Sequence, residues 1–167
     1  MFTITREIGI DAGHRVTHHG SKCKNLHGHR YTVQAVCHGG LIDKGEQEGM
    51  VLDFGFLKEE MMKIIDEPCD HGFILWVDDP LLKQWITDEA RLDLIKLNVE
   101  AVGYCLTSIE GQGKLYVLDS VPTAENLARH WFGRLQPLVA SRSEGNAKLH
   151  KIIVWETPNC QAAYPIV

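Results

Sequence analysis

The sequence lacks several features that mark specialised classes of protein. Its 167 residues contain no run of about 18 apolar residues, so we expect no membrane span. Basic residues are outnumbered, and the formal net charge of −5 argues against a nucleic-acid-binding domain. The opening MFTITREIGID has no basic segment followed by an apolar one, so we expect no secretory signal. These absences favour a soluble, cytoplasmic protein.

The cysteines are odd in number and scattered along the chain, which argues against a disulfide framework. Without an export signal we expect reduced thiols. The five cysteines are Cys23, Cys37, Cys69, Cys105 and Cys160. Histidine, in contrast, is abundant, and most of the nine histidines fall in the first half of the chain.

The hydrophobic pattern predicts one α+β domain over residues 1–167. Residues 3–14 and 26–39 alternate between apolar and polar, which predicts two strands. We expect these strands to pair, separated by a polar loop that carries Cys23. Two further strands are expected at KLYVLD and at LHKIIVWET.

Apolar residues at helical spacing predict two clear helices. Asp53 is the expected N-cap of the first and Thr123 that of the second. Residues 76–113 also contain helical spacing, and we expect a helical insertion there.

Three histidines are placed to meet on one face of the predicted hairpin. His27 and His29 lie two positions apart on a strand, so both imidazoles project the same way, and His14 ends the neighbouring strand. Three neutral imidazoles suit Zn²⁺ and leave a fourth position for water or substrate. A His-x-His pair also arises by chance on strands, and that alternative stays open.

Cys23 has two competing interpretations. It could be a fourth ligand that closes a structural zinc site. It could instead be a thiolate beside a catalytic metal, acting as base or nucleophile. A base would need a relay partner, which Asp70 and His71 in CDHG could supply, although such a pair is often only a surface loop.

Two glutamates are candidates for substrate binding. Glu156 continues the apolar face of the last predicted strand, and a carboxylate there needs partners. A 2-amino-4-oxo pyrimidine ring offers two parallel N–H donors that would satisfy it. An exposed strand end explains Glu156 equally, and the helix dipole alone explains Glu125 in the first turn of a helix.

Six blocks resemble the family of 6-pyruvoyltetrahydropterin synthase and 6-carboxytetrahydropterin synthase. They are DAGH, CKNLHGH, MVLDFGFLK, CDHG, PTAENLA and VWET, in the family's order, between residues 11 and 157. The resemblance implies a tunnelling fold (T-fold): an antiparallel sheet with two helices on one face. It also implies that copies assemble into a β-barrel trimer, commonly doubled to a homohexamer, with active sites at subunit interfaces.

The resemblance also implies roles for individual residues. It makes Cys23 the base that abstracts a proton, with Asp70 and His71 as its relay, supplied by a neighbouring subunit. The implied zinc ligands are His14, His27 and His29. The implied pterin anchor is Glu156, with Thr123 and Glu125 near the ring pocket. A basic patch for the triphosphate could come from Arg15, Lys22, Lys24 and Arg30.

The implied substrate is 7,8-dihydroneopterin triphosphate, and the implied chemistry is that of a zinc-dependent lyase. Elimination of triphosphate, internal reduction of the ring and loss of acetaldehyde give 6-carboxy-5,6,7,8-tetrahydropterin, a precursor in queuosine and other 7-deazapurine biosynthesis. The short spacing from Cys23 to HGH resembles this carboxy branch.

Other functions compete with this one. They are a 6-pyruvoyltetrahydropterin synthase of the tetrahydrobiopterin pathway and a non-catalytic oligomer that binds zinc or pterin. A Cys-His-Asp acyl transferase lacks a recognisable nucleophile elbow. The chain departs from the family pattern at Gly13, where alanine or serine is commoner, and in the length of residues 76–113.

Overall fold

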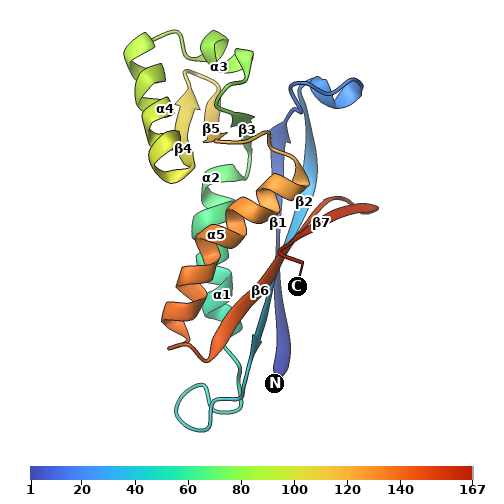
Figure 1. Ribbon diagram of the computed structural model, residues 1–167, viewed down its shortest axis with the longest axis vertical. Coiled ribbons are helices and arrows are strands. Elements are labelled where there is room, and N and C mark those ends of the chain that lie inside the picture. The colour runs from blue at the N-terminus through green and yellow to red at the C-terminus, as the bar shows by residue number, and fades with distance from the viewer. Residues whose placement is uncertain (167) are drawn as a thin grey trace.

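A long antiparallel hairpin of β1 (Phe2–His14) and β2 (His27–Gly39) forms the centre of the fold (Figure 1). In the computed structural model, which describes residues 1–166, Phe2 pairs with Gly39 and His14 pairs with His27. Alternation along each strand explains the pairing, because every second residue reaches the core. The predicted hairpin is therefore confirmed.

The sheet continues on both sides of this hairpin, in the order β4-β5-β3-β1-β2-β6-β7. β6 (Ala147–Thr157) pairs antiparallel with β2, and β7 (Cys160–Tyr164) pairs antiparallel with β6. On the other side, β3 (Gly72–Trp76) runs parallel to β1, and β5 (Gly113–Leu118) runs parallel to β3. β4 (Tyr104–Ile109) pairs antiparallel with β5.

The expectation of an antiparallel sheet is wrong, because the sheet is mixed. Between β2 and β3 the chain passes through α1 (Phe54–Met61), a π turn (Met62–Asp66) and α2 (Glu67–Cys69). These helical residues carry the chain along the sheet, so β3 starts beside the end of β1 and continues in its direction. Parallel strands need such a crossover connection.

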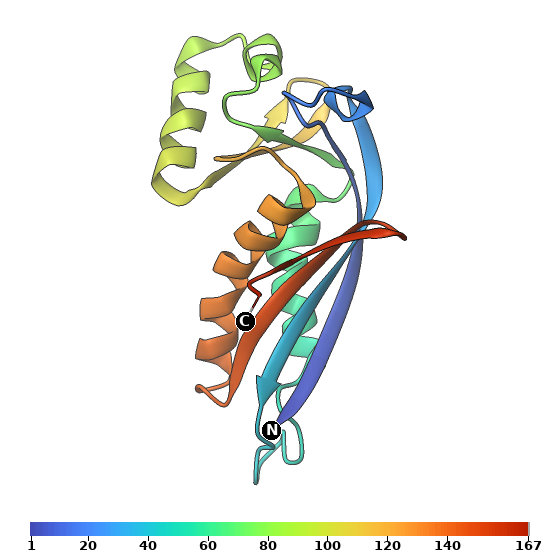
Figure 2. The same ribbon diagram turned by 45° about the vertical axis from the view of Figure 1, so that its right-hand side comes forward.

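α1 and α5 (Ala124–Arg142) lie side by side along the long strands (Figure 2). Both predicted N-caps are confirmed: Asp53 Oδ1 accepts from Gly55 N at 2.7 Å, and Thr123 Oγ1 accepts from Asn126 N at 3.3 Å. The apolar faces of the two helices and the inward residues of β1, β2 and β6 share one core.

Residues 76–113 pack together with β3 and β5 around a second, smaller core. They contain the helices α3 (Pro80–Trp85) and α4 (Glu89–Val102), in line with the expected helical insertion. They also contain the strand β4, which the sequence did not predict. The buried residues of this core are Leu75, Leu82, Ile86, Leu92, Ile95, Val99, Leu115 and Val117. Within the described chain, no helix is both long enough and apolar enough to cross a bilayer.

Replacing Leu135 by alanine should destabilise the fold far more than replacing Leu97. Leu135 of α5 is fully buried, whereas Leu97 of α4 is 60% exposed. We expect Leu135→Ala to lower the free energy of unfolding by about 2–5 kcal/mol, and Leu97→Ala to change it by less than about 0.5 kcal/mol. Guanidinium denaturation at one protein concentration measures both. Equal losses would contradict this division between core and surface.

Candidate active site

Three imidazoles meet at one end of the central hairpin, as predicted. His14 is 1% exposed, His27 lies opposite it on β2, and His29 lies two residues further along β2, opposite Ala12. One ring nitrogen from each histidine lies within 4.8 Å of the others. The ring of Tyr31 packs edge-on against those of His14 and His29, with centroids 5.8 and 5.5 Å away. This packing restricts how the two imidazoles can turn.

Backbone carbonyls fix the protonated nitrogen of two of these rings. His14 Nδ1 donates to Pro122 O and His27 Nδ1 donates to Asn25 O, each at 2.7 Å. In the neutral rings, both Nε2 atoms are then acceptors, yet they lie 3.1 Å apart. Two facing lone pairs at this distance repel each other unless a cation lies between them.

The donor set fits a transition-metal ion. Nitrogens bound to one tetrahedral zinc at about 2.0–2.1 Å lie roughly 3.3 Å from each other, close to the observed separation. A carbonyl that accepts from the non-coordinating nitrogen is a usual partner of a metal-bound histidine. His14, His27 and His29 could therefore hold such an ion.

Electrostatics keep the buried imidazole neutral. Burial, together with the neighbouring His27 and His29, lowers the pKa of His14 to about 4, although its bond to Pro122 opposes the shift. Burial also lowers the pKa of His29, against the opposing effect of Glu156. Neutral imidazole is the form that binds metal, so at neutral pH His14 has its lone pair available.

Glu156 reaches the histidine cluster from β6. Its Oε1 lies 3.5 Å from His14 Nε2 and 3.8 Å from His29 Nε2, and its side chain is 28% exposed. The predicted strand face is correct, because Ile152 and Val154 are fully buried. Glu156 thus stands where the buried face of β6 opens to the surface.

A cavity of about 260 Å³ adjoins the cluster and contains most of the residues that the sequence analysis proposed. It is lined by His14, Cys23, Thr123, Glu125 and Glu156. The Cys23 thiol is partly exposed on a short 3-10 turn (Lys22–Lys24). Within residues 1–166, the compact group of ligand atoms at this site consists of the three imidazoles without Cys23, which favours a thiol beside the metal.

Other residues line the same cavity without any signal in the sequence. His19 comes from the loop after β1, and Cys160 and Gln161 come from β7. The short β7 follows directly after a turn and belongs to no recognised motif. Its place beside β6 depends on the sheet as a whole, so local pattern could not reveal it.

Asp70 and His71 form a pair that does not line this cavity. His71 Nδ1 donates to Asp70 Oδ2 at 2.7 Å, and Asp70 Oδ1 accepts from Asp11 N at 2.8 Å. That backbone bond is the largest influence on the Asp70 carboxyl, and with the bond from His71 it lowers the Asp70 pKa. His71 is largely exposed and lines a separate hollow with Leu26.

The predicted basic patch is partly occupied by ion pairs. Arg15 binds Asp79 through two nitrogens, at 2.7 and 2.5 Å. Arg30 Nη1 donates to Asp11 Oδ2 at 2.7 Å. Lys22 and Lys24 flank Cys23 on the 3-10 turn.

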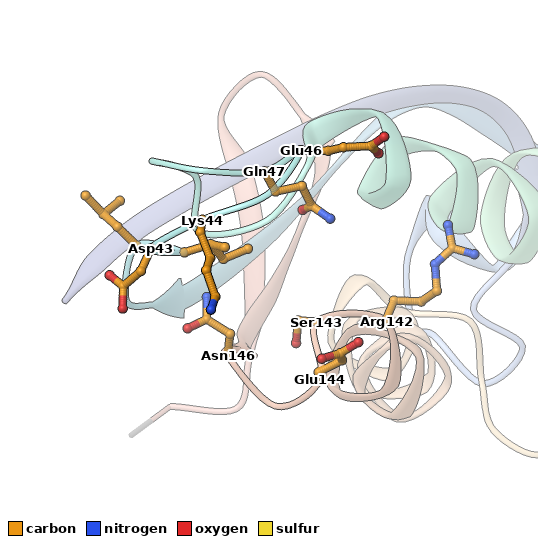
Figure 3. A pocket seen from close by; sticks show the side chains of 10 residues that line it. Asp43, Lys44, Glu46, Gln47, Arg142, Ser143, Glu144 and Asn146 are labelled. Atoms are coloured by element: carbon orange, nitrogen blue, oxygen red, sulfur yellow. The ribbon is translucent and has the colours of Figure 1, made fainter.

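A second cavity, of about 530 Å³, lies at the opposite end of the hairpin (Figure 3). The loop after β2 and the end of α5 form it. The charges of Asp43, Lys44, Glu46 and Glu144 are mixed in sign, and no histidine or cysteine occurs among its described lining residues. No imidazole or thiol is among these lining residues, and the hydroxyl of its one serine, Ser143, donates to Val139 O at 2.7 Å, so we take the histidine end as the candidate active site.

Comparisons with known proteins point to one family. The family model for 6-pyruvoyl tetrahydropterin synthase matches residues 3–166. The 6-carboxy-5,6,7,8-tetrahydropterin synthase of Rickettsia conorii is 36% identical over 161 residues, which cover 96% of this chain and 97% of the relative.

Solved structures share the fold. A crystal structure of an uncharacterized Wolinella succinogenes protein matches with a TM-score of 0.71 and 24% identity, covering 97% of this chain and 96% of the other. The 6-pyruvoyl tetrahydropterin synthase of Plasmodium falciparum matches with a TM-score of 0.60 and 20% identity, covering 97% and 95%.

Removing the His27 imidazole should abolish tight metal binding. Because changing a group that only orients a ligand already costs metal sites about 10–100-fold in affinity, we expect His27→Ala to weaken Co²⁺ binding by at least 100-fold. The control His38→Ala removes a histidine near the other end of β2 and should leave binding unchanged. Visible absorption during Co²⁺ titration measures both. A thiolate-to-cobalt charge-transfer band in the wild type would contradict an uncoordinated Cys23.

Proposed function

The chain belongs to the 6-pyruvoyl tetrahydropterin synthase family, and from this we propose that it converts 7,8-dihydroneopterin triphosphate and water to 6-carboxy-5,6,7,8-tetrahydropterin, acetaldehyde and triphosphate. The observation that carries the proposal is a cluster of three imidazoles beside a cavity that one of them, His14, lines together with the Glu156 carboxylate and the Cys23 thiol. The product would feed queuosine or another 7-deazapurine pathway in the cytoplasm.

We assign the metal site to His14, His27 and His29, with Zn²⁺ as the resident ion. The bound ion supplies a Lewis acid that makes a substrate C–H beside a polarised oxygen more acidic. The chain contributes the orientation of the three rings, through the carbonyls of Pro122 and Asn25 and through packing on Tyr31. These contacts exist before substrate arrives, so little rearrangement is needed.

Cys23 is the proposed base. Its thiolate would accept the acidified proton at Sγ, a role that fits a partly exposed thiol lining the cavity and separate from the ligand group. Glu156, at the mouth of the same cavity, would accept the paired N–H donors of the pterin ring. Thr123 and Glu125, at the start of α5, would line the ring pocket.

We propose that the site is completed by a neighbouring copy. The cavity of about 260 Å³ is smaller than the range of roughly 300–1,000 Å³ usual for ligand sites. Asp70 and His71 lie outside it, as expected if they relay protons to Cys23 of another subunit. The outer edges of β4 and β7 pair with no other strand in the described chain and are available to join copies.

The proposed assembly is a T-fold barrel, as a trimer or a homohexamer of two trimers. Each copy would contribute one T-fold domain, with residues 76–113 as an insertion. The face of the sheet away from α1 and α5 would line the barrel, which leaves both helices on the outside.

Incubation with 7,8-dihydroneopterin triphosphate tests the proposal. We expect wild-type, zinc-loaded protein to release 6-carboxy-5,6,7,8-tetrahydropterin and acetaldehyde, identified by mass spectrometry. Release of 6-pyruvoyltetrahydropterin would assign the tetrahydrobiopterin branch instead. If neither product forms, the chain is a zinc-binding or pterin-binding oligomer and the proposal fails.

Cys23→Ala separates the base from the metal site. Loss of a general base typically slows a reaction about 10²–10⁴-fold, so we expect a kcat loss in that range with zinc content unchanged. The control Cys105→Ala removes a thiol from β4 and should keep full turnover. Full turnover by Cys23→Ala, or loss of its zinc, would contradict the assigned role.

A further inference from the structure

The carboxylate of Asp79 is a buried charge with four hydrogen-bond donors. Asp79 is 1% exposed. Its Oδ2 accepts from Arg15 Nε at 2.7 Å and from the Thr17 hydroxyl, and its Oδ1 accepts from Arg15 Nη2 at 2.5 Å and from Leu81 N at 2.8 Å. Burial alone would raise the pKa of Asp79, but these bonds and the guanidinium charge outweigh it and lower that pKa.

One end of this contact is anchored in the second core. Asp79 is the N-cap of α3, and Pro80 follows at the first helical position. Leu82 and Ile86 pack among the buried residues of α4, β3 and β5. The carboxylate therefore projects from a rigid part of the fold, and ordering it costs little conformational entropy.

The other end is the loop that carries Cys23. Arg15 directly follows His14, and Arg15 and Thr17 flank Val16. Val16 N donates to Cys23 O at 2.8 Å, which closes the loop, and Val16 O accepts from His19 N at 3.0 Å. Asp79 therefore bonds to Arg15 and Thr17, and the residue between them, Val16, is bonded to Cys23.

We propose that Asp79 is a positioning residue that sets where the Cys23 thiol stands relative to the histidine cluster. In this proposal the insertion of residues 76–113 supports the loop that carries Cys23, which lies at the upper end of the molecule in Figure 1. The catalytic consequence rests on the function proposed above, whereas the placement of the loop does not.

The geometry requires a carboxylate. Both oxygens of Asp79 accept two bonds, so an amide at this position would lose two acceptor contacts and turn an N–H₂ group toward donors. The neutral amide would also leave Arg15 without its counter-charge. Asp79→Asn keeps the size of the side chain while breaking the contact of Asp79 with Arg15 and Thr17, here called the clamp.

Asp79→Asn should slow turnover and free the cysteine loop. Misplacing a catalytic group by about 1 Å costs up to 10²-fold, so we expect kcat to fall at least 10-fold while KM changes less than 3-fold. The rate at which iodoacetamide alkylates Cys23, followed by peptide mass spectrometry, should rise at least 5-fold. Cys105 on β4, which does not line the cavity, serves as the internal reference in the same sample, with an unchanged rate.

Asp88→Asn is the matched control. Asp88 caps α4 in the same insertion by accepting from Ala90 N and Arg91 N. The structure gives it no bond to the cysteine loop, so we expect wild-type kcat and an unchanged Cys23 alkylation rate. An equal effect of both variants would reduce Asp79 to a structural cap and overturn the proposal.

A double-variant test isolates the contact. If the clamp acts through Arg15, then Arg15→Gln should reproduce the effects of Asp79→Asn, and combining the two should add little. Fully additive losses would overturn the clamp, as would an unchanged Cys23 alkylation rate in Asp79→Asn. If the wild type does not turn over the pterin triphosphate, the proposed function fails, and the alkylation rates alone decide whether Asp79 holds the loop.

Discussion

The register of the β1–β2 hairpin is the constraint on which the rest depends. With His14 opposite His27, the side chains of His14, His27 and His29 share the end of one sheet face, continuing the buried row that includes Ile10 and Tyr31. A slip of one residue would send one strand's histidines to the opposite face. The same apolar alternation that forms the core therefore brings together the three histidines proposed as metal ligands.

Each part of the candidate site comes from an element that is fixed for other reasons. Pro122, which orients His14, precedes the capped start of α5, and Glu156 lies at the end of a strand buried through Ile152 and Val154. Burial lowers the pKa of His14, the Pro122 carbonyl orients its ring, and its Nε2 faces that of His27 at 3.1 Å, where two lone pairs repel each other. A cation bound between them would relieve that repulsion, which would couple metal binding to the folding of this end of the sheet.

The thiol of the site lies on the loop between the two strands, and loops generally need support from a scaffold. Here the support is a single buried carboxylate from a second core. Its four donors explain how an ionised group tolerates burial, since a paired and hydrogen-bonded charge avoids most of the desolvation penalty. Arg15 and Val16 thus connect the insertion, through Asp79, to the Cys23 loop and to the neighbouring His14.

Local pattern determined much of this protein. Period-two alternation predicted the hairpin and the face of Glu156, helix-cap residues predicted the starts of α1 and α5, and the His-x-His spacing predicted the imidazole cluster. Only the tertiary structure decided that β3 runs parallel to β1, that residues 104–109 add a strand, and that Asp79 meets Arg15 from 64 positions away. It also decided that Asp70 and His71 lie apart from Cys23 in one chain. The physical reason is range: alternation and capping act between neighbours in sequence, whereas strand direction and buried ion pairs depend on how distant segments pack.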